Sequence, residues 1–376
     1  MTELAYKKLL QNEVKTFEDL KNEIIDGNKC CACAACIAYC ESQGFDVIEM
    51  KGDNPEFKSE KSVENCTKCG VCYYICPQTK VLLKQLNEIY GIEDNIGKVV
   101  KILAAKTTNT GLEKVGQDGG VVSAILTYLF EKHKIDAAIV SEFDQNFKPV
   151  PKIIFDKEDL FKSAGTRYSI SPQIFPLKNL YTIPKKILIK KEIFDIDELR
   201  IAFIGTPCQC RAVNKMKFLH VKPAHVIKYI IGLFCFENFI YDKLYDILKR
   251  EIKVDPTNIK KTWIKKNFFI QTKDNKEFEI DIRTLNPAVR NNCHECDEFT
   301  GRFTDISVGA SGAPEGYSMI LIRTDNGKKV INNMLSKGII EQFIVPSNRT
   351  IEWKNKKLEW YNKLISLKIR NQTNMN

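Results

Sequence analysis

The sequence predicts a protein of two parts, a small cysteine-rich α+β unit followed by a larger α/β unit. Cysteines are concentrated in the first part, and beyond about residue 98 apolar strand-like segments alternate with helical ones. A chain of 376 residues is long enough for two or three domains, each with its own core. We therefore expect one domain at residues 1–97 and a mixed α/β domain at residues 98–376.

The overall composition is that of a globular protein, with 44% hydrophobic and 28% charged residues. The formal net charge is +10, but the lysines are scattered and, outside the C-terminal tail, lack the clustered basic face with aromatics that nucleic-acid binding requires. No apolar run approaches the roughly 18 residues of a membrane span, and the N-terminus lacks the apolar core of a secretory signal. We therefore expect a cytoplasmic protein, free or at the periphery of a membrane complex.

Two runs of cysteines, Cys30–Cys40 and Cys66–Cys76, share the spacing C-x2-C-x2-C-x3-C. Pro77 follows the second run, whereas Glu41 takes the place of the proline after the first. This is the ligand pattern of bacterial two-cluster ferredoxins, in which the fourth cysteine of each run binds the other cluster. The predicted ligands of one [4Fe–4S] cluster are Cys30, Cys33, Cys36 and Cys76. Those of the second cluster are Cys40, Cys66, Cys69 and Cys72.

Zinc is the main alternative for these cysteines, because C-x2-C pairs also bind zinc. Two complete and matching runs favour iron–sulfur clusters, and disulfides are less favoured because nothing in the sequence indicates an oxidising compartment. The repeated run predicts an internal duplication. This domain should also contain a helix over residues 2–26 and a strand at Phe45–Met50.

The second domain begins with a predicted strand, helix and strand at Lys98–Ala105, Val121–His133 and Ile135–Val140. The glycine-rich turn Gly116–Gly120 precedes the helix, and such a turn lets the backbone approach a phosphate at the helix N-terminus. The turn is not GxGxxG, so phosphate binding and a merely tight turn both stay open. Arg167 could clamp a phosphate, although an arginine in a surface loop is the simpler interpretation.

Two later strands each lead into a cysteine. Arg200–Gly205 is followed by Cys208, and Val226–Leu233 is followed by Cys235. Open α/β sheets place their sites at the carboxyl ends of strands, and a later C-x2-C pair brings the number of thiols to four. The predicted ligands of a third cluster are Cys208, Cys235, Cys293 and Cys296.

Other interpretations of this third set stay open. Each cysteine taken alone is equally consistent with a small buried hydrophobic residue, and zinc could use His294 as a further ligand. Cys31 and Cys210 belong to no set, and we expect no role for either. The basic segment Trp353–Arg370 is predicted to form a helix that packs on the protein's own core, rather than on a membrane or a partner.

Six motifs, taken in order, resemble the flavoprotein β subunits of coenzyme F-420-reducing hydrogenase. They are GQDGGVVSA (116–124), AGTRYSISP (164–172), GTPCQ (205–209), CFEN (235–238), CHEC (293–296) and DISVGASGAPEGYS (305–318). The resemblance covers about residues 98–345. With the cysteine-rich domain in front, the whole chain resembles the electron-input subunit of methanogen dehydrogenases that oxidise reduced F-420, and the input half of F-420-dependent sulfite reductase.

The resemblance implies that the second domain binds FAD, with the third cluster beside it. The residues that it places around FAD are Gly119, Gly120, Ser123, Thr166, Arg167, Tyr168, Ser169, Gly309, Ser311, Gly312 and Ser318. It implies a reaction in which reduced F-420 gives a hydride to FAD, and electrons then pass through three [4Fe–4S] clusters to a partner subunit, in either direction. The reaction is mediated by the flavin, and the sequence gives no case for a nucleophile or an acid–base triad, so the catalytic residues are left unassigned.

Two other functions stay open. The same module could use ferredoxin or another donor in an organism without F-420, or the chain could be a non-catalytic electron-wire subunit that binds clusters but no flavin. In each case the partner would be an electron-accepting protein, in a larger soluble or membrane-associated redox complex.

Overall fold

The computed structural model describes residues 14–373, with side chains as far as Ile369. The helix predicted for residues 2–26 therefore lies partly outside the described residues. Within them, α2 (Phe17–Leu20) continues directly into the π-helical turn η1 (Lys21–Ile25), and their apolar side chains are buried. Thr16 and Asp19 form a capping box at the start of α2.

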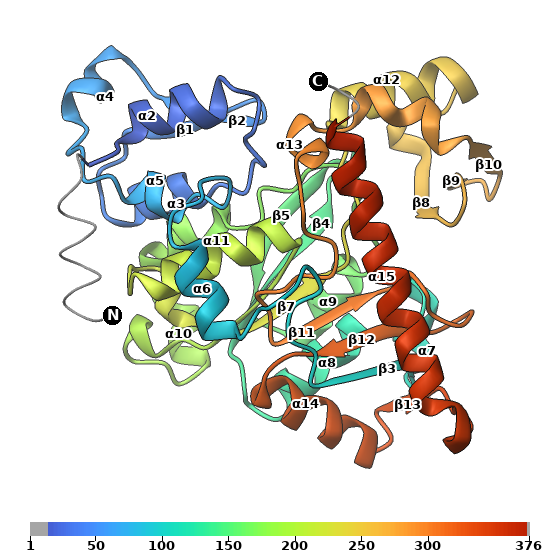
Figure 1. The fold of residues 1–376 in the computed structure, drawn as a ribbon. Helices are drawn as coiled ribbons and strands as arrows, with labels where there is room; N and C mark the ends of the chain where they lie inside the picture. Colours follow the sequence, from blue (N-terminus) through green and yellow to red (C-terminus); the bar gives the residue numbers. More distant parts are fainter. Residues whose placement is uncertain (1–13, 374–376) are drawn as a thin grey trace.

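The N-terminal region is a set of short helices around one antiparallel hairpin (blue in Figure 1). The helices are α3 (Ala35–Ser42), α4 (Glu60–Asn65), α5 (Val71–Ile75) and α6 (Leu83–Tyr90), and the hairpin is β1 (Ile48–Lys51) with β2 (Asn54–Phe57). The strand predicted at Phe45–Met50 starts only at Ile48. Phe17, Ile37 and Ile48 are almost fully buried in a small core that also contains cysteine side chains.

The larger region is built on one mixed sheet of eight strands in the order β13-β3-β12-β11-β7-β6-β4-β5. The strands are β3 (Lys101–Thr107), β4 (Ala137–Phe143), β5 (Pro149–Ile154), β6 (Ile201–Gly205), β7 (Ile227–Leu233), β11 (Ile306–Gly309), β12 (Ser318–Ile322) and β13 (Ile340–Gln342). Strands β4, β6, β7 and β11 are parallel neighbours, and β12 runs antiparallel to both β11 and β3. The predicted mixed α/β architecture is confirmed.

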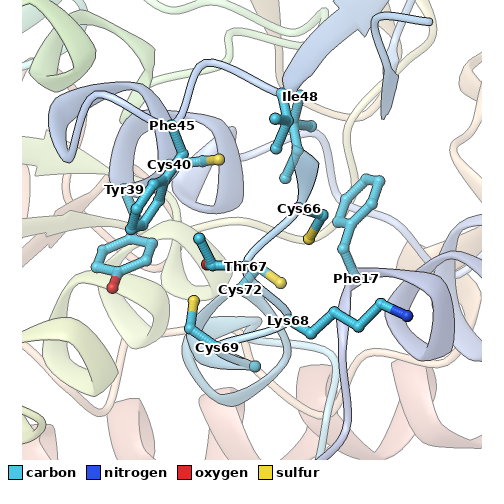
Figure 2. A pocket seen from close by; sticks show the side chains of 12 residues that line it. Phe17, Tyr39, Cys40, Phe45, Ile48, Cys66, Thr67, Lys68, Cys69 and Cys72 are labelled. Atoms are coloured by element: carbon cyan, nitrogen blue, oxygen red, sulfur yellow. The ribbon is translucent and has the colours of Figure 1, made fainter. Parts of the chain in front are cut away.

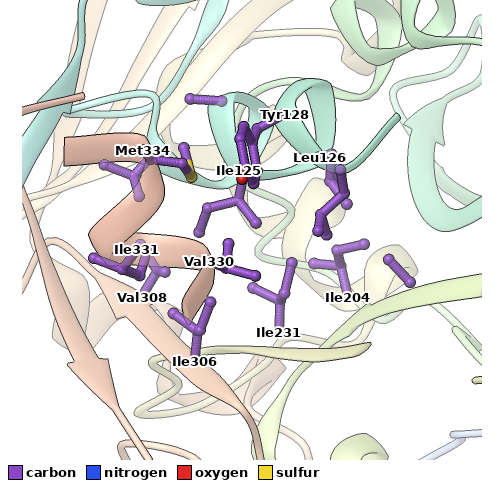
Figure 3. Close-up of a cluster of buried hydrophobic side chains, with 14 of the residues drawn as sticks. Ile125, Leu126, Tyr128, Ile204, Ile231, Ile306, Val308, Val330, Ile331 and Met334 are labelled. Atoms are coloured by element: carbon purple, nitrogen blue, oxygen red, sulfur yellow. The ribbon is translucent and has the colours of Figure 1, made fainter. Parts of the chain in front are cut away.

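Helices cover both faces of this sheet, and alternating strand residues show which face each helix covers. Ala202 and Ile204 of β6 pack with α8 (Val121–Glu131) and α14 (Asp325–Ser336) in the core that Figure 3 shows. Their neighbours Ile201 and Phe203 face the opposite side, where α11 (Pro207–Phe218) packs. Helix α11 therefore lies between the sheet and the N-terminal region (Figure 1).

The C-terminal helix α15 (Thr350–Thr373) runs along the same face of the sheet as α11, over β3 and β12 (red in Figure 1). Tyr361 and Ile365 are fully buried against the sheet. The prediction that this helix packs on the protein's own core is therefore confirmed. Within residues 14–373, no helix is long and apolar enough to cross a membrane.

A second, three-stranded sheet that the sequence did not predict flanks the main one. It consists of β8 (Ile259–Ile264), β9 (Phe268–Thr272) and β10 (Glu277–Ile280), all antiparallel. The remaining helices are α7 (Thr110–Val115), α9 (Leu160–Ser163), α10 (Lys185–Lys190), α12 (Tyr241–Ile252) and α13 (Asn291–His294). This second sheet packs with α12 around its own apolar cluster, which includes Phe239 and Phe268.

Candidate functional site

The first thiol set comes together around one hollow in the N-terminal region. Cys30, Cys33, Cys36 and Cys76 all line it, and the hollow contains about 350 Å³ of space free of atoms. Leu20, Ile24 and Ile25 form part of the wall, so the surroundings are apolar. The structure therefore groups three cysteines of the first run with the last cysteine of the second run. This is the grouping that the sequence analysis predicts for one cluster.

The second thiol set lines a separate hollow, which Figure 2 shows from close by. Cys40, Cys66, Cys69 and Cys72 line this hollow, of about 340 Å³, and their side chains surround a common space. Again the fourth thiol comes from the other run. Thr67, Lys68 and Cys69 are exposed to solvent, so this hollow lies at the surface of the protein.

The two cysteine loops repeat the same backbone geometry. Ala32 and Lys68, which precede the second cysteine of each run, have positive φ angles of 49° and 52°. Ala34 and Gly70 occupy the next matching position, with φ of 64° and 74°, and each is followed by a helix. Positive φ is uncommon for residues other than glycine and persists only where the surroundings require it. The repeated strain indicates that both loops are shaped for the same task.

Residues from the larger region hold the backbone of the first set. Arg290 Nε donates to the Cys30 carbonyl at 2.6 Å, and the Ile174 amide donates to the Cys33 carbonyl at 3.1 Å. Lys215 Nζ donates to the Cys76 carbonyl at 2.5 Å and to the Thr79 carbonyl at 2.8 Å. Lys215 is fully buried in α11 beside this thiol set. Burial lowers the pKa of its amine to about 7, and the nearby Cys76 thiol opposes that shift.

The third set, Cys208, Cys235, Cys293 and Cys296, gathers next to the carboxyl edge of the main sheet. Cys208 lies in the first turn of α11, after β6, and Cys235 follows β7. Burial raises the pKa of the Cys235 thiol well above its usual value, and the nearby Cys293, Cys208 and Cys296 thiols raise it further. Cys235 is therefore the electrostatic neighbour of the other three thiols that the sequence analysis grouped.

A buried ionic network holds the loop that carries two of these thiols. Glu298, just after Cys296, is almost fully buried and accepts from Arg211 at 2.9 Å, while Arg302 lies 3.2 Å away. Lys368 of α15 donates to the Glu298 carbonyl at 2.6 Å and to the Cys235 carbonyl at 3.2 Å. Lys368 is thus a second buried cation beside a thiol set.

The donor chemistry of all three sets fits iron–sulfur clusters, because each consists of soft thiol ligands only. Burial raises the pKa of the Cys40 and Cys76 thiols to about 11, so binding a metal would have to release their protons. Among residues 14–373, no group of three or more His, Cys, Asp or Glu side chains is arranged to hold a single metal ion. Cys210, two residues after Cys208 in α11, is fully buried in the core between this helix and the sheet.

The glycine-rich turn before α8 packs on the carboxyl edge of the sheet. The Gly119 amide donates to the Ser318 hydroxyl at 3.1 Å, and the Thr107 amide donates to the Gly119 carbonyl at 2.7 Å. A Cβ atom on Gly119 would lie 2.5 Å from the Ala105 carbonyl oxygen, so only glycine fits. Gly120 has a φ of 63° and caps α8, which leaves the amides at the start of that helix free for a ligand.

The guanidinium group of Arg167 is engaged by its own loop and does not extend outward to bind a phosphate. Its Nη1 atom donates to the carbonyls of Ser163, Ala164 and Gly165 at 2.6–2.8 Å, and its guanidinium stacks on Phe143. These contacts satisfy the carbonyls at the end of α9. The arginine therefore holds the shape of its own loop, and its Nε atom is buried without a hydrogen-bond partner.

The loop around Tyr168 links the main sheet to the second sheet. The Tyr168 hydroxyl accepts from the Ile264 amide at 3.0 Å and is near the Thr166 hydroxyl, and burial raises the pKa of this phenol to about 12. Ser169 is buried and pairs through its backbone with Phe239, four residues after Cys235. The predicted flavin loop and the third thiol set are therefore joined through one segment.

Three other residues that the resemblance places around FAD, Gly309, Ser311 and Gly312, lie elsewhere along the carboxyl edge of the main sheet. Ser311 accepts from Trp360 Nε1 at 3.0 Å, and Gly312 lies against the same side chain, so both are next to α15. A Cβ atom on Gly309 would overlap the Phe234 ring. Packing within the protein explains why these positions are small. Ser123 is half-buried in the first turn of α8.

Charged residues that the sequence analysis missed lie next to the glycine-rich turn. Lys261 Nζ on β8 donates to the Gly116 carbonyl at 3.3 Å, and Lys265 forms a 3.5 Å ion pair with Glu315. Asp118, an exposed residue of the turn, neighbours both lysines. These lysines come from the second sheet, which carries no motif, so only the fold could identify them.

Several buried polar atoms around this edge lack a hydrogen-bond partner, which native proteins rarely tolerate without a ligand or water. These atoms are Gln117 Oε1, Arg167 Nε, Ser169 Oγ, Asn238 Oδ1 and Asn292 Oδ1. All belong to segments that follow strand ends or flank the third thiol set. The residues present therefore fit a polar, phosphate-bearing group such as FAD.

Comparisons with known proteins agree with these features. The chain matches models of the coenzyme F-420 hydrogenase/dehydrogenase beta subunit in two parts, the N-terminal part at residues 102–178 and the C-terminal part at residues 198–344. One of the subunits of the F(420)H(2) dehydrogenase of Methanosarcina mazei is 33% identical over 315 residues, which is 82% of each chain.

Two further relatives share parts of the chain. The coenzyme F-420-dependent sulfite reductase of Methanocaldococcus jannaschii is 29% identical over 85% of this chain and 48% of its own length. A chain of the F-420-reducing [NiFe] hydrogenase complex of Methanosarcina barkeri has the same fold, with a TM-score of 0.63 and 27% identity over 76% of this chain and 93% of its own. The chain described here therefore belongs to the family of coenzyme F-420 hydrogenase/dehydrogenase beta subunits.

Proposed function

We propose that this chain is an iron–sulfur flavoprotein that exchanges a hydride with coenzyme F-420 and single electrons with a partner subunit. The observation that carries the proposal is the arrangement of the three thiol sets. The third set adjoins the polar edge of the sheet, Cys208 of that set packs against the apolar cluster that contains Cys33 of the first set, and the second set reaches the surface at Cys69. Relatives named as F-420-dependent hydrogenase and dehydrogenase subunits support the substrate.

The three thiol sets would each hold one [4Fe–4S] cluster, which accepts and donates one electron at a time. The protein contributes the surroundings: Lys215 and Arg290 donate to the backbone of the first set, and Lys368 donates to the backbone of the third. A nearby cation stabilises the extra negative charge of a reduced cluster. These side chains would therefore favour reduction at the two inner sites.

FAD, when bound at the carboxyl edge, would supply the chemistry that converts a hydride into single electrons. Gly119 and Gly120 would let it approach the start of α8, and the free amides there would face its phosphates. Ser169 and Asn238 would gain the hydrogen bonds that they lack. Lys261 and Lys265 give this edge a positive charge, which suits a substrate with a phosphorylated, acidic tail.

The partner would dock where the second thiol set is exposed. Of the four cysteines in this set, Cys69 is open to solvent, and Thr67 and Lys68 beside it are exposed as well. The residues that line this hollow, among those that the structure describes, all belong to the N-terminal region. We propose an electron-accepting protein there, as the names of relatives that are subunits of larger enzymes also suggest.

An anaerobic titration with reduced F-420 tests the proposal. The chain, loaded with iron and flavin, should show bleaching of flavin absorbance, and metal analysis should find about twelve iron atoms per chain. Bound flavin that does not bleach would reject F-420 as the donor. A loaded chain that releases no flavin on denaturation would instead indicate an electron-wire subunit. Zinc in place of iron would reject the cluster assignment itself.

A further inference from the structure

Arg211 of α11 connects the backbone of the first thiol set to the loop of the third. It lies three residues after Cys208, and its side chain is only 12% exposed. Its Nη1 atom donates to the Pro77 carbonyl at 3.3 Å, next to Cys76 of the first set. Its Nη2 atom donates to Glu298 at 2.9 Å, in the loop of the third set. A guanidinium group presents its donors in a rigid fork, so one side chain holds both loops at a fixed separation.

Arg290 makes a second connection of the same kind. It lies three residues before Cys293 of the third set, and the Cys293 amide donates to the Arg290 carbonyl at 2.9 Å. Its buried side chain reaches the N-terminal region, where Nε donates to the Cys30 carbonyl at 2.6 Å and Nη2 to the Asp53 carbonyl at 3.1 Å. Hydrogen bonds from a guanidinium group are charge-assisted and therefore strong. The loop that carries Cys293 is thus tied directly to a residue of the first set.

We propose that Arg211 and Arg290 are positioning residues that together clamp the first thiol set against the third, and so fix the separation of the two centres held there. The inference rests on the proposed function, because it requires clusters in both sets. Pro77 follows the second cysteine run, whereas Cys30 begins the first run, so the two arginines hold different loops of the first set. Electron transfer between the two centres requires them to be held close, and residues that position reacting groups can change rates strongly without contacting them.

Arg302 offers a matched control, because it contacts the same two carboxylates as Arg211. Arg302 donates to Asp297 at 2.8 Å and lies 3.2 Å from Glu298, and Arg211 donates to these side chains at 3.2 and 2.9 Å. The Nη1 atom of Arg302 donates to Asn95 at 3.4 Å, in the segment after α6. Replacing either arginine by glutamine removes one positive charge beside the third set. Of the two substitutions, it is Arg211→Gln that also removes a contact with the first set.

The test is electron paramagnetic resonance of the anaerobically loaded full chain after complete reduction with sodium dithionite. Two neighbouring reduced centres split each other's signals by a magnetic interaction that falls steeply with their separation. The signal of the third centre, identified by its loss in Cys296→Ser, should be split in the wild type. Arg211→Gln and Arg290→Gln should each reduce the splitting, and the double variant should lose it. Arg302→Gln should keep it.

Two further measurements separate the position of the centres from the charge around them. The midpoint potential of the third centre should fall by similar amounts in Arg211→Gln and Arg302→Gln, because each variant lacks one nearby positive charge. Reduction of the first centre after rapid mixing with reduced F-420 should slow by about 10-fold in the double variant, within the range typical of residues behind the ligands.

An unchanged splitting in a double variant with full iron content would overturn the inference. An equal loss of splitting in Arg302→Gln would also overturn it, because the ionic network alone would then position the centres. Where the double variant does not fold, each single variant that folds decides: a reduced splitting supports the inference, and an unchanged one overturns it. A wild-type chain that binds no iron would overturn the proposed function together with the inference. A loaded wild type whose third-centre signal is not split would overturn the inference alone.

Discussion

The first and second thiol pockets have the same cysteine spacing and loop backbone, but they have opposite surroundings. The loop residues Cys31 and Ala32 of the first pocket are buried, and Lys215 from α11 supports its backbone. The matching residues of the second pocket, Thr67 and Lys68, are exposed, and no residue of the larger region lines that hollow. Two copies of one motif thus face different neighbours.

The cysteine spacing is therefore shared by the two pockets, and what distinguishes them is the part of the protein that packs around each. Reduction potentials of iron–sulfur clusters depend on nearby charge, hydrogen bonds and solvent exposure. All three factors differ between the pockets: Lys215 adds a charge below its lowered pKa of about 7, Arg290 adds a donor to the Cys30 carbonyl, and Cys69 is exposed. We expect the first pocket to connect inward and the second to connect outward.

The largest expected effect comes from removing the fourth thiol of one pocket at a time. Cys76→Ser should cost the first pocket its cluster, about four of about twelve iron atoms, because a hydroxyl is a poor ligand for iron. Electron transfer from F-420 to an external acceptor should fall more than about 100-fold, beyond the 10–100-fold typical of residues behind the ligands. Iron analysis and acceptor reduction measure both effects.

Cys40→Ser is the matched control for that experiment. It should also lose about four iron atoms, but the flavin and the other two centres should still be reduced by F-420. If Cys76→Ser and Cys40→Ser abolished the same spectroscopic signal, the exchange of fourth ligands between the two runs would be wrong.

The second-largest effect is expected on protein stability, when residues at matching positions of the two cysteine loops are substituted. Ala32→Lys would place a charge where the native side chain is 1% exposed, and should destabilise the protein by about 4 kcal/mol or more. Lys68→Ala, at the matching exposed position, should change stability by no more than about 0.5 kcal/mol. Chemical denaturation of the two variants measures both values, and similar losses would contradict the difference in surroundings.

Much of this comparison could be predicted from the sequence, because ligand spacing is a local property. The cysteine runs indicate which thiols meet, and the structure places Cys36 and Cys76 in the same hollow. Strands ending at Cys208 and Cys235 likewise predict that these thiols meet at one edge. The experiments above test which metal groups and which cofactor bind in these pockets and at the carboxyl edge of the main sheet.

The surroundings of the pockets could not be predicted in the same way. Lys215 lies in the same helix as Lys217, and nothing in its local sequence indicates that it is fully buried. Gly119 was interpreted as a ligand contact, yet its missing side chain is required by the Ala105 carbonyl. Arg167 bonds its own loop. Each of these depends on contacts between segments far apart in the chain.

A third, smaller effect on stability and reduction potential is expected from removing the buried Lys215 side chain. Lys215→Met keeps most of the volume but removes the Lys215 donor from the carbonyls of Cys76 and Thr79, which should cost about 1–3 kcal/mol, although the Cys76 carbonyl still accepts from the Thr79 hydroxyl at 3.0 Å. Because burial lowers the pKa of Lys215 to about 7, the variant should also lower the potential of the first centre below about pH 7, where the lysine carries the positive charge that stabilises the reduced state. Thermal unfolding and redox titration measure the two consequences.

Lys217→Met provides the control on the same helix. Lys217 donates to the Ile227 carbonyl at 2.8 Å, away from every thiol set, so its loss should affect stability but not the potential. An equal shift in potential for both variants would contradict a local effect of Lys215.

The smallest expected effect is kinetic and requires no substitution. An iron chelator should remove metal from the second pocket before the first, since Cys69 is exposed, whereas Cys33 and Cys36 are buried. Under anaerobic conditions, the release of iron to the chelator should therefore show two phases. The fast phase comes from the second pocket if it is absent in the Cys40→Ser variant. Arg290→Gln should speed the slow phase, because it removes the donor to the Cys30 carbonyl and loosens the contact that covers the first pocket. A single phase in the wild type would mean that the two pockets are equally accessible, and the contrast in their surroundings would then have no consequence for the metal.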